Sequence, residues 1–203
     1  MPVDLAHLRV EWRDQWDAAI ISTERELGRW MRSGSASTLT AVTSLHYRRP
    51  EEADHLRVVD AIPVWWGMPT GVAPTGLLPR LFFQHFTNTS ILVEDDDGAL
   101  AAFLIGFRSA SRPDTAYVHF VGVAPDLRGR GVARDLYERF FTMMREEGCT
   151  TVEAITGPIN RGSQSFHRAL GFTQGGDTDL DGVLAYRDYD GRGEHRVTFN
   201  RQL

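Results

Sequence analysis

Cysteine is almost absent from this sequence, and the single thiol, Cys149, excludes a disulfide within the chain. Long apolar runs are missing too, since no stretch approaches the roughly 18 residues that a membrane-spanning helix needs. The N-terminus lacks the basic and apolar regions of a signal peptide. There is no basic excess, because the formal net charge is −5, and this disfavours a nucleic-acid-binding protein. We therefore expect a cytoplasmic protein with neither a membrane nor a nucleic acid as partner.

Two regions differ in pattern. Residues 3–32 carry apolar side chains at spacings close to three and four, which predicts a helix. The segment Ser33–Ser37 (SGSAS) then forms a small flexible break. We interpret residues 1–37 as an N-terminal helical arm and residues 38–203 as the main domain. The arm carries three tryptophans, so we expect it to pack on its own domain, with a homodimer through the arm as the alternative.

The main domain alternates strand and helix patterns, which predicts an α+β fold with a mixed sheet and helices on both faces. The expected strands are 38–48, 90–94, 99–108, 118–123, 150–156, 183–189 and 195–203. The expected helices are 48–62, 76–86, 132–147 and 160–170, with a loop at 63–74 and turns at 95–98, 177–182 and 190–194.

The stretch from Val118 to Leu136 stands out because a strand, a glycine-rich turn and a helix follow one another. Pro125 ends the strand because it has no N–H to donate. Gly129 and Gly131 then precede the helix. Backbone N–H groups at a helix start have no partner within the helix, and together they form a binding place for phosphate.

Two familiar phosphate motifs do not fit this turn. A dinucleotide-binding motif needs G-x-G-x-x-G, and Arg134 stands where the third glycine would be. A P-loop needs G-K-[ST], which is absent at this point. Taken alone, R-G-x-G is more often a tight turn with solvated arginines than a ligand site.

The pattern is longer than the turn, however, and it resembles the GCN5-related N-acetyltransferase (GNAT) superfamily, the acyl-CoA N-acyltransferase fold. The family's R-x-x-G-x-A form matches Arg128, Gly131 and Ala133. A second form matches Asn160, Ser163 and the Leu170–Phe172 end (LGF). The resemblance covers residues 39–203. It implies a central, mostly antiparallel sheet with a β-α-β unit that binds acetyl-coenzyme A (acetyl-CoA).

The resemblance also implies which residues hold the cofactor. The strand before the turn should splay from its parallel neighbour and pair with the pantetheine arm, while the turn binds the pyrophosphate. The predicted cofactor-binding residues are Val121, Gly122, Val123, Arg128, Gly129, Arg130, Gly131, Val132, Ala133, Arg134, Asn160 and Ser163.

The implied reaction is acetyl transfer to a primary amine by direct attack in a ternary complex. Many relatives use a tyrosine to protonate the leaving thiolate; here His167 occupies that position and is the predicted acid. A base must take the amine proton, and His119 on the central strand is our choice, ahead of Glu94 and Asp95. Either histidine could instead be a packed, half-buried residue. Cys149 lies beside acidic residues, which disfavours a reactive thiolate.

The acceptor should bind across the sheet from the cofactor, where the aromatic segment at 65–83 predicts a lined pocket. The predicted lining residues are Trp65, Trp66, Met68 and Phe83. The acceptor is a small-molecule or peptide amine, and no metal is expected. Two alternatives are a non-catalytic acetyl-CoA-binding or interaction module and, less favoured because of Arg134, a nicotinamide enzyme.

Overall fold

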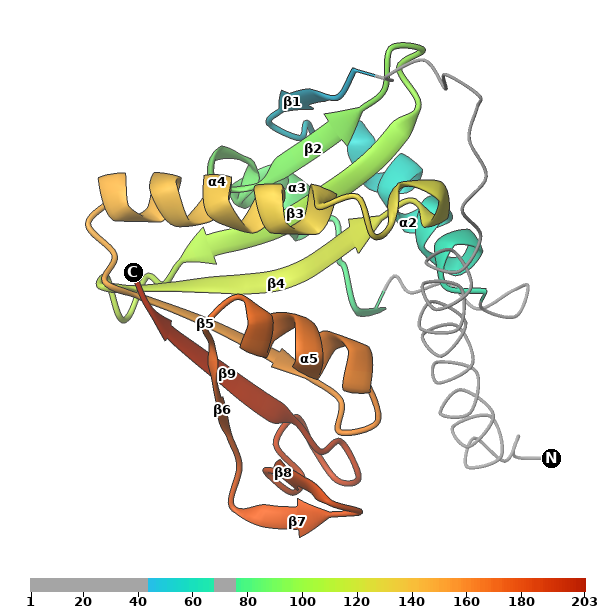
Figure 1. Cartoon of the computed structure of the whole chain (residues 1–203). Helices are drawn as coiled ribbons and strands as arrows, with labels where there is room; N and C mark the ends of the chain where they lie inside the picture. Colours follow the sequence, from blue (N-terminus) through green and yellow to red (C-terminus); the bar gives the residue numbers. More distant parts are fainter. Residues whose placement is uncertain (1–43, 68–75) are drawn as a thin grey trace, which may run out of the picture.

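The computed structural model describes residues 44–67 and 76–203, which form a seven-stranded mixed sheet in the order β1-β2-β3-β4-β5-β9-β6 (Figure 1). The predicted arm at 1–37, its boundary with the main domain, the first part of the predicted strand at 38–48, and Met68 lie outside the described residues. The fold class predicted from the sequence is confirmed for the part that is described.

The first half of the sheet is an antiparallel meander. Its strands are β1 (His46–Arg48), β2 (Ile91–Glu94), β3 (Leu100–Arg108) and β4 (Thr115–Val123). The β2–β3 connection is the predicted tight turn, where Gly98 has a φ of 76° that suits glycine. The turn predicted at residues 95–98 is therefore confirmed.

The second half begins with a strand–helix–strand crossover that makes β5 parallel to β4. Its elements are α4 (Val132–Glu146), β5 (Thr151–Thr156), α5 (Arg161–Ala169), β6 (Thr173–Gly175), β7 (Thr178–Leu180), β8 (Val183–Ala185) and β9 (Val197–Gln202). β9 lies between β5 and β6 and is antiparallel to both. The strand predicted at 183–189 is shorter than expected, and the predicted turn at 177–182 contains β7, which pairs with β8.

The helices before the meander are α2 (Asp54–Trp65) and α3 (Leu81–His85), and two short 3-10 turns are η2 (Thr87–Thr89) and η3 (Pro125–Leu127). The loop predicted from Pro63 is wrong at its start, because α2 continues through Pro63 to Trp65. A proline so near the end of a helix removes one hydrogen bond only. Trp65 meanwhile stacks on buried Phe103 at 5.8 Å, which holds the last turn in place.

The sheet is covered on both faces. Buried residues of α4 pack against one face, and those of α2 and α3 pack against the other. Figure 1 shows α4 crossing β3 and β4, and α5 lying beside β5 and β9. Among the described helices, none has the length and apolarity to cross a membrane.

Candidate functional site

The parallel strands β4 and β5 pair over only part of their length. Thr115–Val118 pairs with Thr151–Ala154, but β4 continues to Val123 without β5 beside it. Figure 1 shows the two strands diverging from a shared end. The predicted splay is therefore present, and the second half of β4 has an edge that no described strand pairs with.

The backbone of this open edge presents N–H groups outward. Ala124 donates its N–H to Ala101 on β3 at 2.9 Å. Because N–H groups alternate between the two edges of a strand, those of Val121 and Val123 point away from β3. Both residues are among those predicted to bind the cofactor. Two donors thus face the gap between β4 and β5.

The glycine-rich turn continues this edge with a row of free amides. Within the described part of the chain, no residue accepts a hydrogen bond from the six amides of Gly129–Arg134, whereas Asp135 N–H bonds Gly131 C=O and starts the helical ladder. Gly129 and Gly131 have φ values of 72° and 86°, in the left-handed region that favours glycine. The turn therefore has free backbone donors at the N-terminus of a 15-residue helix, the arrangement that favours anions.

The three arginines of the turn differ in their contacts. Arg128 is half-buried and donates hydrogen bonds to the carbonyls of Val123 (3.2 Å) and Trp65. Burial lowers the pKa of its guanidinium, and no carboxylate in the described ranges balances its charge. Arg130 and Arg134 are exposed at the mouth of the turn. All three belong to or adjoin the run of free amides, so this turn carries three positive charges.

Asn160 and Ser163 are joined to each other. The Asn160 side chain accepts the N–H of Ser163 at 3.0 Å, so Asn160 is the N-cap of α5. Ser163 Oγ lies 3.2 Å from His167 Nδ1. Their contacts account for a structural role, and their cofactor-binding role stays a prediction.

His119 is the extra residue of a β-bulge. Phe120 pairs with Ile105 and Val118 with Gly106, which leaves His119 without a partner on β3. Its ring stacks on Phe82 of α3 at 4.1 Å, and its Nε2 lies 2.7 Å from the Leu77 carbonyl. A carbonyl can only accept, so Nε2 carries the proton and Nδ1 keeps a free lone pair.

The bulge also changes which residues share a face with His119. A period of two would place Val121 on the same face as His119, but Val121 packs with the α4 cluster and Phe120 with the α2–α3 cluster. The extra residue reverses the alternation beyond it. His119 therefore lies on the α2–α3 face of the sheet. Burial there lowers the pKa of its imidazole.

His167 lies in the interior and is 4% exposed. Its ring stacks on Phe199 at 4.3 Å. Nδ1 is 2.8 Å from the Ser163 carbonyl and therefore donates, so Nε2 accepts from the Tyr137 hydroxyl at 2.9 Å. Both nitrogens are used and almost no ring surface is open to a thiol. The acid role of His167 stays a prediction that this geometry does not support.

Burial lowers the pKa of His167 to about 4, which predicts a pH-dependent stability. The unfolded chain, with a pKa near 6.5, takes up the proton first as the pH falls. The free energy of unfolding should then decrease by roughly 3 kcal/mol between about pH 6.5 and pH 4. Urea denaturation across this range measures the slope. His167→Phe should remove much of it, and an unchanged slope would contradict the assignment of the buried neutral imidazole.

The predicted acceptor-lining residues lie at different depths. Trp65 and Phe83 are core residues, 9% and 1% exposed, and Phe83 offers no surface to a ligand. Trp66 is partly exposed and meets Phe120 edge-on at 5.7 Å. Of the aromatic set, Trp66 is thus the described residue with ring surface near the second half of β4, and its lining role stays a prediction.

His119 has a further neighbour that no local sequence pattern indicates. Asp190, from the loop between β8 and β9, lies near enough to His119 to oppose part of the fall in its pKa. Burial first, and then Tyr189 and Asp190, raise the pKa of Tyr117 on β4. Asp190 also pairs with Arg196 at 2.7 Å. A polar loop from the end of the chain therefore borders the His119 face.

Comparison with known proteins identifies the family of this chain. Residues 59–172 match the Acetyltransferase (GNAT) family model, more than half of the chain. A L-2,4-diaminobutyric acid acetyltransferase from Nocardia farcinica is 30% identical over 95 residues, which cover 47% of this chain and 49% of that protein. The enzyme of the same name from Streptomyces coelicolor is 35% identical over 85 residues (41% and 50%). The matches span about half the length of these curated relatives.

Solved structures share the fold at low identity. The diaminobutyrate acetyltransferase EctA from Paenibacillus lautus, solved with L-2,4-diaminobutyric acid and coenzyme A, has a TM-score of 0.53 and 23% identity, over 77% of this chain and 95% of that one. The ribosomal-protein-S18-alanine N-acetyltransferase from Escherichia coli has a TM-score of 0.55 and 18% identity (78% and 94%). With the splayed strands, the glycine-rich turn and the matching family model together, the chain belongs to the GNAT acetyltransferase family.

Proposed function

We propose that this protein transfers an acetyl group from acetyl-CoA to a primary amine of a small acceptor. One observation carries the proposal: the open edge of β4 runs directly into the six free amides of Gly129–Arg134. An extended arm with a pyrophosphate at one end matches this succession of donors. Few other classes of ligand combine an extended arm that can pair with a strand edge and an anionic group that can bind the turn next to it.

The residues fit the cofactor as follows. The N–H groups of Val121 and Val123 would pair with the pantetheine arm, and the turn amides would hold the pyrophosphate with added charge from Arg128, Arg130 and Arg134. When bound, acetyl-CoA supplies the acetyl group as a thioester. A β4 amide at the open edge would then donate to the thioester oxygen as negative charge develops there.

His119 supplies the base in this proposal. The Leu77 carbonyl fixes the proton on Nε2, so Nδ1 can accept a proton from the attacking amine. Its lowered pKa keeps the imidazole neutral near pH 7. Stacking on Phe82 holds the ring in one orientation. His167 takes no part in this proposal, since both of its nitrogens are occupied by hydrogen bonds to Tyr137 and Ser163.

Direct attack fits better than a cysteinyl intermediate. Cys149 is 4% exposed, and burial raises the pKa of its thiol. A buried thiol with a raised pKa forms little thiolate at neutral pH and is a weak nucleophile. Cys149→Ala should therefore leave acetyl transfer intact.

The acceptor class is inferred from the relatives, which are named for a small diamino acid substrate. The polar loop beside His119, with Asp190 held by Arg196, offers charges of both signs. An amino acid acceptor carries both signs as well. We therefore place L-2,4-diaminobutyrate and similar amino acids ahead of peptide amines.

A thiol-release assay tests the function. The full chain, acetyl-CoA and a panel of amines are mixed, with L-2,4-diaminobutyrate, other diamino acids and a peptide with a free N-terminus in separate wells. We expect amine-dependent release of coenzyme A, largest for a small diamino acid. Tight acetyl-CoA binding without thiol release for any amine would favour the non-catalytic module instead.

The pH dependence of the reaction is a second expectation. Because the His119 pKa lies below 6.5, kcat/KM should be constant near neutral pH and should fall as the solution is acidified through that lowered value. The decrease reflects protonation of Nδ1, which removes the acceptor lone pair. Steady-state rates between about pH 5 and pH 8 give the profile. An acidic limb centred above 6.5 would point to another base.

A further inference from the structure

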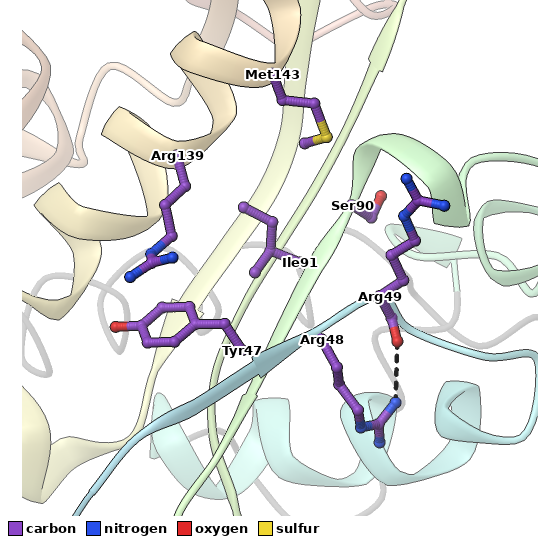
Figure 2. A pocket seen from close by; sticks show the side chains of 7 residues that line it. All are labelled: Tyr47, Arg48, Arg49, Ser90, Ile91, Arg139 and Met143. Carbon is purple, nitrogen blue, oxygen red and sulfur yellow. Dashed lines mark hydrogen bonds between the residues drawn. The ribbon is translucent and has the colours of Figure 1, made fainter.

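A hollow on the surface of the protein lies away from the open edge of β4. It has a volume of about 350 Å³ and lies between β1, β2 and the second half of α4, with Tyr47, Ile91, Arg139 and Met143 among its lining residues (Figure 2). In the sheet order, β2 and β3 separate β1 from β4. The hollow therefore shares no lining residue with the proposed acetyl-transfer site.

Arg48, one of the arginines that line the hollow, already uses all of its hydrogen-bond donors. Arg48 uses Nε on Glu94, and its two terminal nitrogens bond Asp54, Glu94 and the Arg49 carbonyl. A guanidinium has five N–H donors, and these five contacts occupy all of them. In Figure 2 the Arg48 side chain turns away from the hollow. Arg48 therefore supports the wall and does not bind a ligand.

Arg139 and Arg49 are different, because both keep donors for a ligand. Arg139 lies 3.9 Å over the Tyr47 ring and makes one hydrogen bond to a carboxylate, from Nε to Asp135 at 2.8 Å. The Tyr47 ring and Asp135 fix the orientation of the Arg139 guanidinium. Its two terminal nitrogens lie at the wall of the hollow. Arg49 is exposed and has no carboxylate partner in the described part of the chain; its side chain reaches only Asn88 Oδ1, at 3.5 Å.

The floor between these two arginines is apolar. Ile91 lies at the centre of the view in Figure 2 and Met143 beside it, with Arg139 on one side and Arg49 on the other. A neutral ligand would leave the Arg49 charge without a carboxylate and the terminal N–H groups of Arg139 without an anionic acceptor, and inorganic phosphate would leave the apolar floor uncovered. A short hydrocarbon chain with a carboxylate at each end satisfies all of these surfaces.

We propose that this hollow binds a small aliphatic dicarboxylate, one carboxylate on Arg139 and the other on Arg49, with its methylene chain over Ile91 and Met143. Planar guanidinium groups bind carboxylates through paired hydrogen bonds, so the site selects carboxylates by shape as well as by charge. The site is open to solvent, and its affinity should therefore fall with ionic strength. It is independent of the acetyl-transfer proposal.

Titration of the full chain with glutarate, followed by calorimetry at low salt, tests the proposal. Glutarate should bind with one-to-one stoichiometry, and its uncharged diamide should not. Arg49→Gln should weaken glutarate binding by about tenfold or more, and Arg139→Gln should do the same. Arg145→Gln, which removes an exposed charge from the same helix outside the hollow, should leave binding unchanged.

Three results would overturn the site. The first is no heat of binding with glutarate, and the second is equal affinity for glutarate and its diamide. The third is equal weakening of glutarate binding by all three substitutions, which would mean a response to net charge alone. In the described part of the chain the Arg49 side chain makes one hydrogen bond, to Asn88, so Arg49→Gln is expected to fold normally, and thermal unfolding checks this. Thiol release by Arg49→Gln should match the wild-type rate without glutarate.

Discussion

Replacing His119 by glutamine is expected to lower kcat/KM for the acceptor amine by about 10²- to 10⁴-fold, the range typical for loss of a general base. Glutamine can still donate to the Leu77 carbonyl, which now holds Nε2 at 2.7 Å, but its amide cannot take a proton near pH 7. The KM for acetyl-CoA should change little, because the pyrophosphate turn lies elsewhere. Initial rates with saturating acetyl-CoA give the comparison.

A matched substitution separates chemistry from charge and folding. His46→Gln removes an exposed histidine from β1, where Nε2 pairs with Asp96 at 2.9 Å, and it should keep nearly full activity. If His119→Gln retains wild-type kcat/KM and the same acidic limb, then a water relay or another residue is the base. Thermal unfolding of both variants shows whether the fold is intact.

Adding one methyl group to β4, as Gly122→Ala, should destabilise the fold by about 1–3 kcal/mol, as overpacking does. A Cβ at this position would lie 2.6 Å from Phe103 Cε1 and 3.1 Å from Trp66 Cη2. Phe103 cannot retreat, because it is fully buried and stacks on Trp65 on one side and Phe120 on the other. The strand would have to shift, and the open edge with it, so acetyl transfer should also fall. Urea denaturation measures the loss.

Gly157→Ala is the control for that substitution. It adds the same methyl group where the nearest atom, in Ile159, is 3.9 Å away, and it should leave the free energy of unfolding unchanged or raise it by up to about 1 kcal/mol. Equal stability of the two alanine variants would contradict the packing described around Phe103.

Local sequence signals predicted most of the fold. Pro125 follows the end of β4, and Gly98 closes the turn between β2 and β3, as predicted. These features act within a few residues of themselves, so a single sequence contains them. The free amides of the glycine-rich turn follow from the same kind of local rule.

The acceptor half depends on contacts between distant segments, and there the sequence was less informative. No local pattern indicates the bulge that makes His119 an unpaired residue, since it arises from the register of β3 against β4. The burial of His167 depends on Tyr137 and Phe199, which come from other elements. The loop with Asp190 reaches β4 because β9 enters the sheet between β5 and β6.

A crystal structure with coenzyme A and L-2,4-diaminobutyrate bound tests the central claim most directly. Our account predicts the pyrophosphate on the amides of Gly129–Arg134, the pantetheine arm along Val121 and Val123, and the acceptor amine within hydrogen-bonding distance of His119 Nδ1. A cofactor bound away from the open edge of β4, or an amine on the opposite face of the sheet from His119, would contradict it.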